Sequence, residues 1–273
     1  MGDWSLQHTG GGGIESSGLG TTSRGKVVTA HATVNTKGTV VELIAATAYE
    51  SGGIYLTAHS NTSAASILCD ILIGAATESV LIPNVLFCRT NQIHIMSAYF
   101  PIRVPKGSRI SARTQSNVTG ALLYVLAQMI PTGPRMPPPF NRVTAYGVST
   151  TTSLGTAVDA GGTADTKGAF TELVASTTNP IRGAVVAIGP DTDVTTAALC
   201  YFSLDVGVGA ATEDVVIPDM TIVRETASDQ PKPSHFGPYP VIAPAASRIT
   251  ARTQCSVNTA GDRVIQVAVY GLD

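Results

Sequence analysis

Short runs in which apolar and polar side chains alternate recur along the chain, and no stretch shows the 3.6-residue period of an amphipathic helix. Residues 66–74 (SILCDILIG) and 199–209 (LCYFSLDVGVG) alternate with a period of two, which is typical of strands that bury one face. Turn-forming Gly, Asn, Asp, Ser and Pro separate such runs about every ten residues. The pattern predicts an all-β protein built from β-sandwiches or small jelly rolls.

The same segments occur twice in the same order. SRISARTQS (108–116) returns as SRITARTQC (247–255), and GAATESVLIP (74–83) returns as GAATEDVVIP (209–218). The spacing is 130 residues at the start (21 to 151), then 135 (74 to 209), then 139 (108 to 247), so it grows only between matched blocks, as loop insertions would make it. We therefore predict two tandem homologous β-sandwich domains, jelly-roll-like, each of an ordinary domain size.

The expected boundaries follow from the matched blocks. We expect a flexible N-terminal arm at 1–20, repeat 1 at 21–130, a Pro-rich linker at 131–142 and repeat 2 at 143–273. Prolines in the linker favour an extended conformation, so we expect it to space the domains semi-rigidly. The arm carries Trp4, the only tryptophan, and is either an assembly arm that docks on a neighbouring subunit or a disordered terminus.

Composition excludes several classes of protein. The net charge is −2 and 13% of residues are charged, without the clustered Lys and Arg of a nucleic-acid-binding surface. The apolar stretches are far shorter than the ~20 residues of a membrane span, so we expect no membrane insertion. The first residues lack the basic and apolar regions of a signal peptide, so we expect synthesis and folding in the cytoplasm.

Motifs of known catalytic or metal-binding chemistry are not found. The sequence lacks a nucleophile elbow, a phosphate-binding loop, a dinucleotide fingerprint, a zinc-protease motif and an EF-hand loop. The histidines have no second ligand at metal-binding spacing, and the four cysteines occupy unrelated positions in the two repeats. We therefore expect no enzyme, no cofactor, no metal and no disulfide framework. Cys69 is most simply a small buried hydrophobe.

Charged residues that recur in both repeats are candidates for structural ion pairs. Glu42 alternates with Val40 and Ile44, which predicts a carboxylate on an apolar face, where an unpaired charge costs several kcal/mol. Two pairings are open: either Glu42 and Glu172 bind the second arginine of each motif, or Asp70 and Asp205 do. A binding role for the arginines is the alternative. The candidates are Arg109, Arg113, Glu42 and Asp70 in repeat 1 and Arg248, Arg252, Glu172 and Asp205 in repeat 2.

The repeats differ most in two loops, and one of these carries aromatic and histidine side chains in both copies. Such side chains on loops suit contacts with protein or sugar. Alternatively, the aromatic residues near 99–101 only close the end of their own sandwich. The candidate contact residues are His94, Tyr99 and Phe100 in repeat 1 and His235, Phe236 and Tyr239 in repeat 2.

The run ESVLIPNVLF (78–87) followed by YFPIRVPKGSRISARTQS (99–116) resembles a repeat of tailed-bacteriophage structural proteins. There, a segment close to IPNLL precedes P-I-x-I-P-x-G-S-R-I-x-A-R-x-Q-S. Repeat 2 departs from that pattern, with Ala246 at the place of Gly107 and Asp219 at the place of Asn84. The resemblance implies a virion component and has no catalytic meaning.

These observations favour a non-enzymatic bacteriophage virion structural protein, associated with the tail tip, baseplate or fibre and a candidate for host-surface binding. A capsid decoration protein is the alternative, and a soluble carbohydrate-binding module is the alternative of another class. Expected partners are further copies of the chain, other virion proteins and, as a candidate, a host-surface glycan or protein. A trimer is favoured because it would present six similar domains in a threefold ring. The expected location is the virion, after synthesis in the host cytoplasm.

Overall fold

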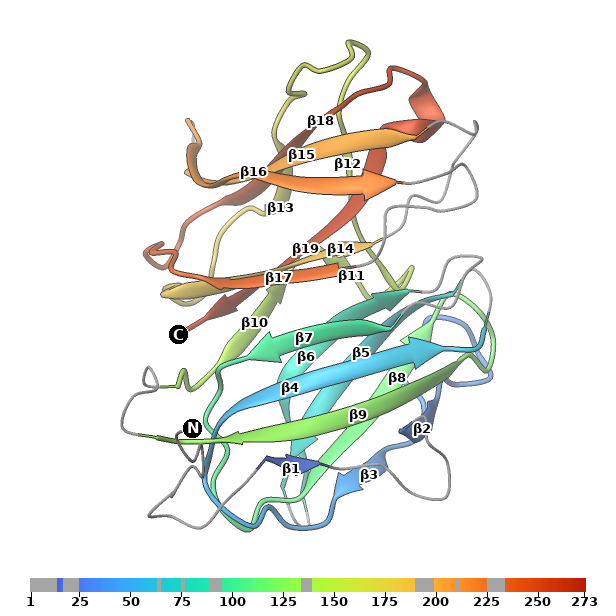
Figure 1. The fold of residues 1–273 in the computed structure, drawn as a ribbon, viewed down its shortest axis with the longest axis vertical. Helices are drawn as coiled ribbons and strands as arrows, with labels where there is room; N and C mark the ends of the chain where they lie inside the picture. The colour runs from blue at the N-terminus through green and yellow to red at the C-terminus, as the bar shows by residue number, and fades with distance from the viewer. Residues whose placement is uncertain are drawn as a thin grey trace, which may run out of the picture.

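The computed structural model describes residues 14–16, 25–62, 65–74, 77–88, 95–133, 139–189, 199–209, 212–224 and 234–273 (Figure 1). Within these ranges the chain forms β-strands and one short 3-10 helix, η1 (Ala260–Asp262). The all-β class predicted from the alternation is confirmed. No helix in the described part of the chain is long and apolar enough to cross a membrane.

Repeat 1 is a sandwich of two antiparallel sheets. Sheet 1a has the strand order β2 (Lys26–Thr29), β9 (Leu122–Pro131), β4 (Ser51–Ser60), β7 (Met96–Phe100), and β1 (Glu15–Ser16) pairs with β9 next to β2. Sheet 1b has the order β3 (Val41–Ile44), β8 (Ile110–Ser116), β5 (Ser66–Ile73), β6 (Ser79–Cys88). Without the short β1, each sheet has four strands, and two four-stranded sheets connected in this order form a jelly roll.

Repeat 2 has the same topology. Sheet 2a has the order β12 (Leu154–Asp159), β19 (Val264–Leu272), β14 (Gly183–Gly189), β17 (Ser234–Tyr239), extended by β10 (Val143–Tyr146) and β11 (Val148–Ser149). Sheet 2b has the order β13 (Thr171–Val174), β18 (Ile249–Cys255), β15 (Cys200–Val208), β16 (Asp214–Arg224). The duplication seen in the sequence is therefore a duplication of the jelly roll.

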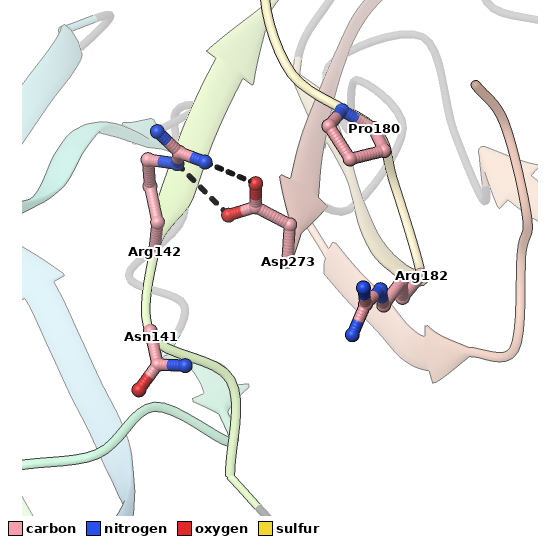
Figure 2. Close-up of a pocket in the computed structure, with 5 residues that line it drawn as sticks. All are labelled: Asn141, Arg142, Pro180, Arg182 and Asp273. Carbon is pink, nitrogen blue, oxygen red and sulfur yellow. Dashed lines mark hydrogen bonds and ion pairs between the residues drawn. The ribbon is translucent and has the colours of Figure 1, made fainter. Parts of the chain in front are cut away.

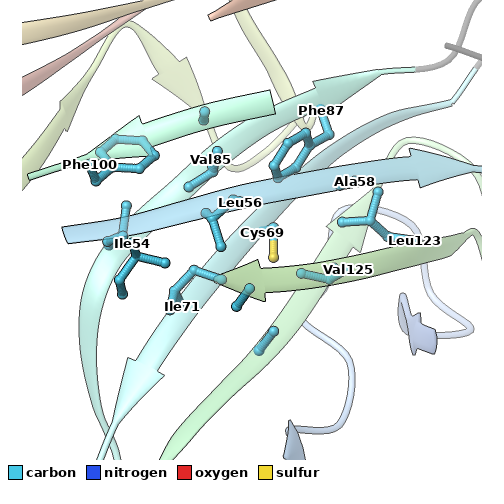
Figure 3. Close-up of a cluster of buried hydrophobic side chains, with 14 of the residues drawn as sticks. Ile54, Leu56, Ala58, Cys69, Ile71, Val85, Phe87, Phe100, Leu123 and Val125 are labelled. Atoms are coloured by element: carbon cyan, nitrogen blue, oxygen red, sulfur yellow. The ribbon is translucent and has the colours of Figure 1, made fainter. Parts of the chain in front are cut away.

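The core of repeat 1 fills the space between its two sheets (Figure 3). Ile54 and Leu56 of β4 face Cys69 and Ile71 of β5, and all four are fully buried. Full burial of a large aliphatic side chain stabilises a fold by about 1.5–3 kcal/mol. Cys69 packs as the small hydrophobe that the sequence predicts, and burial raises the pKa of its thiol to about 12.

The N-terminal segment is partly paired, contrary to the expectation of a free arm through residue 20. Glu15 and Ser16 lie opposite Met129 and Gln128 on β9. The Glu15 carboxylate accepts the Ala48 N–H at 2.9 Å. Trp4 lies outside the described residues.

The segment between the repeats does not space them apart, so the expectation of a semi-rigid spacer is wrong. The Phe140 N–H donates to the Pro101 carbonyl at 2.8 Å, and the Phe140 carbonyl accepts the Arg103 N–H at 2.9 Å. On its other side the Phe140 ring is so close to Gly183 that a Cβ there would lie 2.9 Å from it. Because the repeats pack directly on each other (Figure 1), the described end of the linker is fixed to both.

Candidate functional site

One network of charged groups occupies the outer face of sheet 1b. Asp70 on β5 is almost fully buried, and its carboxylate accepts three hydrogen bonds. The donors are Arg113 Nε, Lys37 Nζ and the Asn84 N–H, each 2.9 Å away. Burial lowers the pKa of Lys37, and the attraction of Asp70 opposes this shift.

Repeat 2 builds the same network on sheet 2b. Asp205 accepts hydrogen bonds from Arg252 Nε at 2.9 Å, Lys167 Nζ at 2.7 Å and the Asp219 N–H at 2.9 Å. Burial favours the neutral form of Asp205, but these three donors together hold its pKa below the ordinary value. Of the two pairings that the sequence leaves open, the structure has the one with Asp70 and Asp205.

The network holds a β-bulge in the edge strand of each sheet. Asn84 and Asp219 have left-handed backbone angles, with φ of 50° and 51°. The register of β6 against β5 shifts at this point, and so does that of β16 against β15. The buried carboxylates accept the N–H groups that the bulges leave unpaired. Because bulges bend and twist a strand, the network sets the direction of β6 and β16.

The first arginine of each motif pairs with two glutamates. Arg109 Nε lies 2.9 Å from Glu42 and Arg109 Nη1 lies 3.3 Å from Glu78. In repeat 2, Arg248 has the same two contacts, with Glu172 at 2.9 Å and with Glu213 at 2.6 Å. The pairing of Glu42 with Arg113, and of Glu172 with Arg252, is therefore wrong.

The premise of a buried Glu42 is wrong as well, because the alternation on β3 breaks. A register shift between Glu42 and Ile44 lets both Leu43 and Ile44 turn inward, where each is 7% exposed. The Glu42 side chain stays 47% exposed. Glu172 is equally exposed, at 47%, next to the corresponding shift in β13.

The two repeats meet where the outer face of sheet 2a covers the edges of β6 and β7 (Figure 1). Tyr270 on β19 lies at the centre of this contact and is fully buried. Its hydroxyl oxygen accepts the Leu86 N–H at 2.7 Å, and the hydroxyl donates to the Asn84 carbonyl at 2.9 Å. Burial raises the pKa of Tyr270.

Apolar side chains around Tyr270 join the core of repeat 1. Val185 and Ala187 of β14, with Ala268 and Leu272 of β19, pack into the same cluster as the repeat 1 core. Gly189 lets Leu86 approach closely, because a Cβ at Gly189 would lie 3.1 Å from a Leu86 methyl group. Sheet 2a therefore acts as a third wall of the repeat 1 core, between the edges of its two sheets.

A second polar contact joins the repeats. Gln115, the glutamine of the first arginine motif, donates from Nε2 to the Thr150 carbonyl at 2.6 Å and to Ser153 Oγ at 3.0 Å. Ser153 Oγ in turn donates to Asn35 Oδ1 at 2.8 Å. This part of the repeated motif therefore contributes to contact between domains.

The aromatic residues expected on contact loops lie on strands. Tyr99 and Phe100 belong to β7, and Phe100 is fully buried with its ring edge-on to Tyr270, 5.5 Å between centroids. The expectation of a contact loop is wrong for Phe100, because Met96, Ala98 and Phe100 alternate as the inward side of a strand. His94 lies outside the described residues.

Their counterparts in repeat 2 belong to β17, which includes His235, Phe236 and Tyr239. The His235 ring lies 5.4 Å from the Phe87 ring of repeat 1, between centroids. Both of its nitrogens are shielded from solvent. Burial lowers the pKa of His235 to about 4, and its approach to the Leu86 backbone opposes that shift only in part. His235 therefore belongs to the contact between the repeats.

Sequence reasoning missed the contact between the repeats, although a signal for it exists. Residues 183–189 (GAVVAIG) form an unbroken apolar run, and all seven are buried. Such a run indicates a strand that is covered on both faces, whereas an alternating run indicates one covered face. In repeat 1 the matching strand β4 ends in alternation.

A buried ion pair in repeat 2 was also missed. Arg224 Nη1 lies 3.1 Å from Asp262 Oδ1, and both side chains are 0% exposed. The thiols of Cys200 and Cys255 each lie 3.8 Å from the Asp262 carbonyl oxygen. Arg224 and Asp262 are 38 residues apart, and nothing in their local sequence indicates that they meet.

An open pocket lies at the junction of the repeats, lined by Asn141, Arg142, Pro180, Arg182 and Asp273 (Figure 2). Arg142 crosses it and donates from Nε to Asp273 Oδ1 at 2.9 Å. The Asp273 carboxylate is thus paired with Arg142, so the described residues of the pocket offer no free acid–base pair. In the described part of the chain no group of three or more His, Cys, Asp or Glu side chains could hold a metal ion.

No family model and no curated protein matches this chain. Among solved structures, the CBM22 tandem domain of Paenibacillus barcinonensis Xyn10C is 11% identical, with coverage of 97% of this chain and 92% of that chain and a TM-score of 0.27. A peptide-N(4)-(N-acetyl-β-D-glucosaminyl) asparagine amidase is 9% identical, with coverage of 90% of this chain and 96% of that chain and a TM-score of 0.34. A chain in a structure of infectious bursal disease virus, Gx strain, is 11% identical, with coverage of 83% of this chain and 58% of that chain and a TM-score of 0.21. At these TM-scores none of the three bears on function.

Proposed function

We propose that the chain is a non-enzymatic structural protein of a tailed-bacteriophage virion and acts through protein contacts. The observation that carries this proposal is the contact between the repeats. Much of the outer face of sheet 2a covers two strand edges and extends a core, as at a permanent protein–protein interface. The likeness of residues 78–116 to the repeat of tailed-phage structural proteins supports the same class.

The charged residues that the two repeats share support a structural role. Asp70 and Asp205 take up the second arginine of each motif, and Glu42 and Glu172 take up the first. Since these groups neutralise one another on the outer faces of sheets 1b and 2b, they favour a framework role over a binding site.

We assign the protein to the tail tip, baseplate or fibre, with capsid decoration as the alternative place. Both places require self-association and contact with other virion proteins, and a tail-tip position adds a host-surface glycan or protein as a candidate partner. Immunogold labelling of purified particles of the encoding phage tests this. Label at the tail tip supports the first place, label over the capsid supports the second, and particles that lack the chain by mass spectrometry would overturn the proposal.

A carbohydrate-binding role is the second candidate, and one feature favours it. On the outer face of sheet 1a the rings of His59 and Tyr124 stack, with centroids 4.7 Å apart and planes 13° apart. Asn61 donates to the Tyr124 hydroxyl at 2.9 Å. An aromatic platform of this kind suits a sugar ring. Specific glycan binding by the full chain, lost in Tyr124→Ala, would support this role.

A further inference from the structure

The contact between the repeats joins two different surfaces, and the duplication supplies a second copy of each. Within the chain, the outer face of sheet 2a covers the β6 edge. The counterparts are the outer face of sheet 1a, here the repeat-1 face (Tyr55, Thr57, His59, Tyr124, Leu126 and Gln128), and the β16 edge (Asp219, Thr221 and Val223). Leu86 on the covered edge is 1% exposed. Its counterpart Thr221 and the neighbouring Asp219 are exposed.

Strand registers fix which residues correspond. Val185 lies opposite Tyr270 in sheet 2a, and Tyr55 lies opposite Gln128 in sheet 1a, so Gln128 has the place of Tyr270. Leu86 lies opposite Leu68 on β5, and Thr221 lies opposite Ser203 on β15, so Thr221 has the place of Leu86. The Leu86 N–H points away from β5 and toward Tyr270. By the same register the Thr221 N–H points away from β15.

The polar centre of the contact is chemically retained. Tyr270 uses one hydroxyl both to accept the Leu86 N–H and to donate to the Asn84 carbonyl. A glutamine amide also carries one acceptor and one donor group. Gln128 can therefore accept the Thr221 N–H through Oε1 and donate to the Asp219 carbonyl through Nε2.

Side-chain sizes change in a compensating way. In the covered contact the large Leu86 lies over Gly189, which lies opposite Gln266. In repeat 1 the corresponding position is His59, opposite Tyr124. The residue that would lie over His59 is the smaller Thr221. Both contacts therefore place a small residue against a large one. In the covered contact the large residue lies on the strand edge, and in the proposed contact it lies on the sheet face.

The repeat-1 face has the composition of an interface. It combines two tyrosines and a histidine with Leu126, which takes the place of Ala268. Val27 on β2, 37% exposed, lies opposite Tyr124 and extends the apolar area. Tyrosine is enriched among the residues that dominate binding at interfaces.

The second contact is duplicated in sequence too. Gln254 has the place of Gln115, and Thr21-Thr22-Ser23 repeats Thr151-Thr152-Ser153. Residues 21–23 lie outside the described residues and are not part of the surfaces named here.

We infer that copies of this chain associate head to tail, with the repeat-1 face of one copy receiving the β16 edge of a second copy. The inference deepens the proposed function, which requires self-association. A head-to-tail contact joins different surfaces, so it generates a ring when the rotation closes. Three chains would form a ring of six jelly rolls.

The test uses light scattering on the full chain and on three variants. Leu126→Arg places a charge in the repeat-1 face, Thr221→Arg places one in the β16 edge, and Val40→Arg changes an exposed residue of the β3 side as the control. All three positions are at least partly exposed, and circular dichroism confirms folding. We expect an oligomer for the wild type and Val40→Arg, and association weakened by about 100-fold or more for the other two.

Mixing the two interface variants separates this contact from others. Leu126→Arg keeps an intact β16 edge, and Thr221→Arg keeps an intact repeat-1 face. An equimolar mixture therefore forms a dimer that grows no further, although each variant alone is monomeric. A symmetric contact would not give this rescue. A monomeric wild type, unaffected variants or a mixture without dimer would overturn the inference.

The proposed function can fail separately. Particles that lack the chain would remove the virion role even if the purified protein forms rings. Glycan binding by a monomeric wild type would instead assign the repeat-1 face to a sugar and overturn the head-to-tail contact.

Discussion

Sheets 1a and 2a have the same strand order but different surroundings. The outer face of sheet 2a carries Val185, Ala187 and Ala268 and is covered by repeat 1, whereas the outer face of sheet 1a carries Tyr55, Thr57 and Leu126 at the same places and is partly exposed. The charged networks of sheets 1b and 2b, by contrast, match almost group for group. The comparison shows that duplication kept the charged networks of sheets 1b and 2b and changed the surfaces that sheets 1a and 2a present.

The largest expected effect is a loss of stability that originates in repeat 2 alone. Asp262→Ala removes a fully buried carboxylate that pairs with the buried Arg224, so we expect a loss of about 3–5 kcal/mol in the free energy of unfolding. Urea denaturation measures it. The double variant Arg224→Met, Asp262→Leu should recover most of the loss, because apolar residues of similar volume often replace a buried pair without cost. A loss as large in the double variant would contradict this explanation.

Acid should weaken the contact between the repeats through His235. The folded pKa is about 4, below the ordinary 6.5, because burial favours the neutral ring. The unfolded chain then binds more protons between these values, so stability is full above pH 6.5 and falls as pH drops toward 4. We expect the free energy of unfolding to fall by about 2–3 kcal/mol between pH 6.5 and pH 4.5. Thermal melting of the wild type and His235→Leu measures it, and an equal pH slope in both would refute this cause.

The shared networks offer a matched pair of variants. Asp70→Ala and Asp205→Ala each remove a buried carboxylate that binds one lysine and one arginine. Because these cations are partly exposed, we expect each variant to lose about 2 kcal/mol of the free energy of unfolding, with similar losses in the two. Denaturant titration compares them. Clearly unequal losses would show that the charged networks of sheets 1b and 2b do not contribute equally to stability.

Tyr270→Phe tests the polar centre of the contact. It leaves the Leu86 N–H and the Asn84 carbonyl without the hydroxyl, so we expect about 1–2 kcal/mol of lost stability. Gln128→Ala, at the corresponding place in repeat 1, should leave the stability of the dilute monomer unchanged. Calorimetry on both variants checks the difference, and equal effects would remove the asymmetry between sheets 1a and 2a.

The smallest effect concerns the exposed glutamates. Glu42→Gln and Glu172→Gln should each cost less than about 1 kcal/mol, because half-exposed ion pairs are screened by water. Melting temperatures close to the wild type would agree with this. A loss of about 2 kcal/mol or more would restore the buried-carboxylate interpretation.

The sequence predicts the class, the duplication and the shared frame, because these depend on local alternation and on residues that recur in register. It also offers Asp70 as the partner of Arg113, as one of two pairings. It does not predict the bulge that turns Glu42 outward, since a register shift depends on the partner strand β8.

The contact between the repeats is harder to predict for another reason. Tyr270 meets Leu86 across 184 residues, and no local pattern encodes which strand edge a face will cover. The unbroken apolar run at residues 183–189 indicates that a second face is buried, without naming its partner. The linker composition suggests separation, whereas Phe140 is bound on both sides.

Strand β19 of repeat 2 completes the core of repeat 1, and this has a consequence for synthesis. Repeat 1 has all its own strands once β9 has left the ribosome, but Tyr270, Ala268 and Leu272 of β19 follow only after the other strands of repeat 2. Until then the side between β6 and β7 remains uncovered and apolar, a surface that favours aggregation and chaperone binding. Prematurely terminated chains therefore expose this surface, so cellular quality control can remove them before assembly.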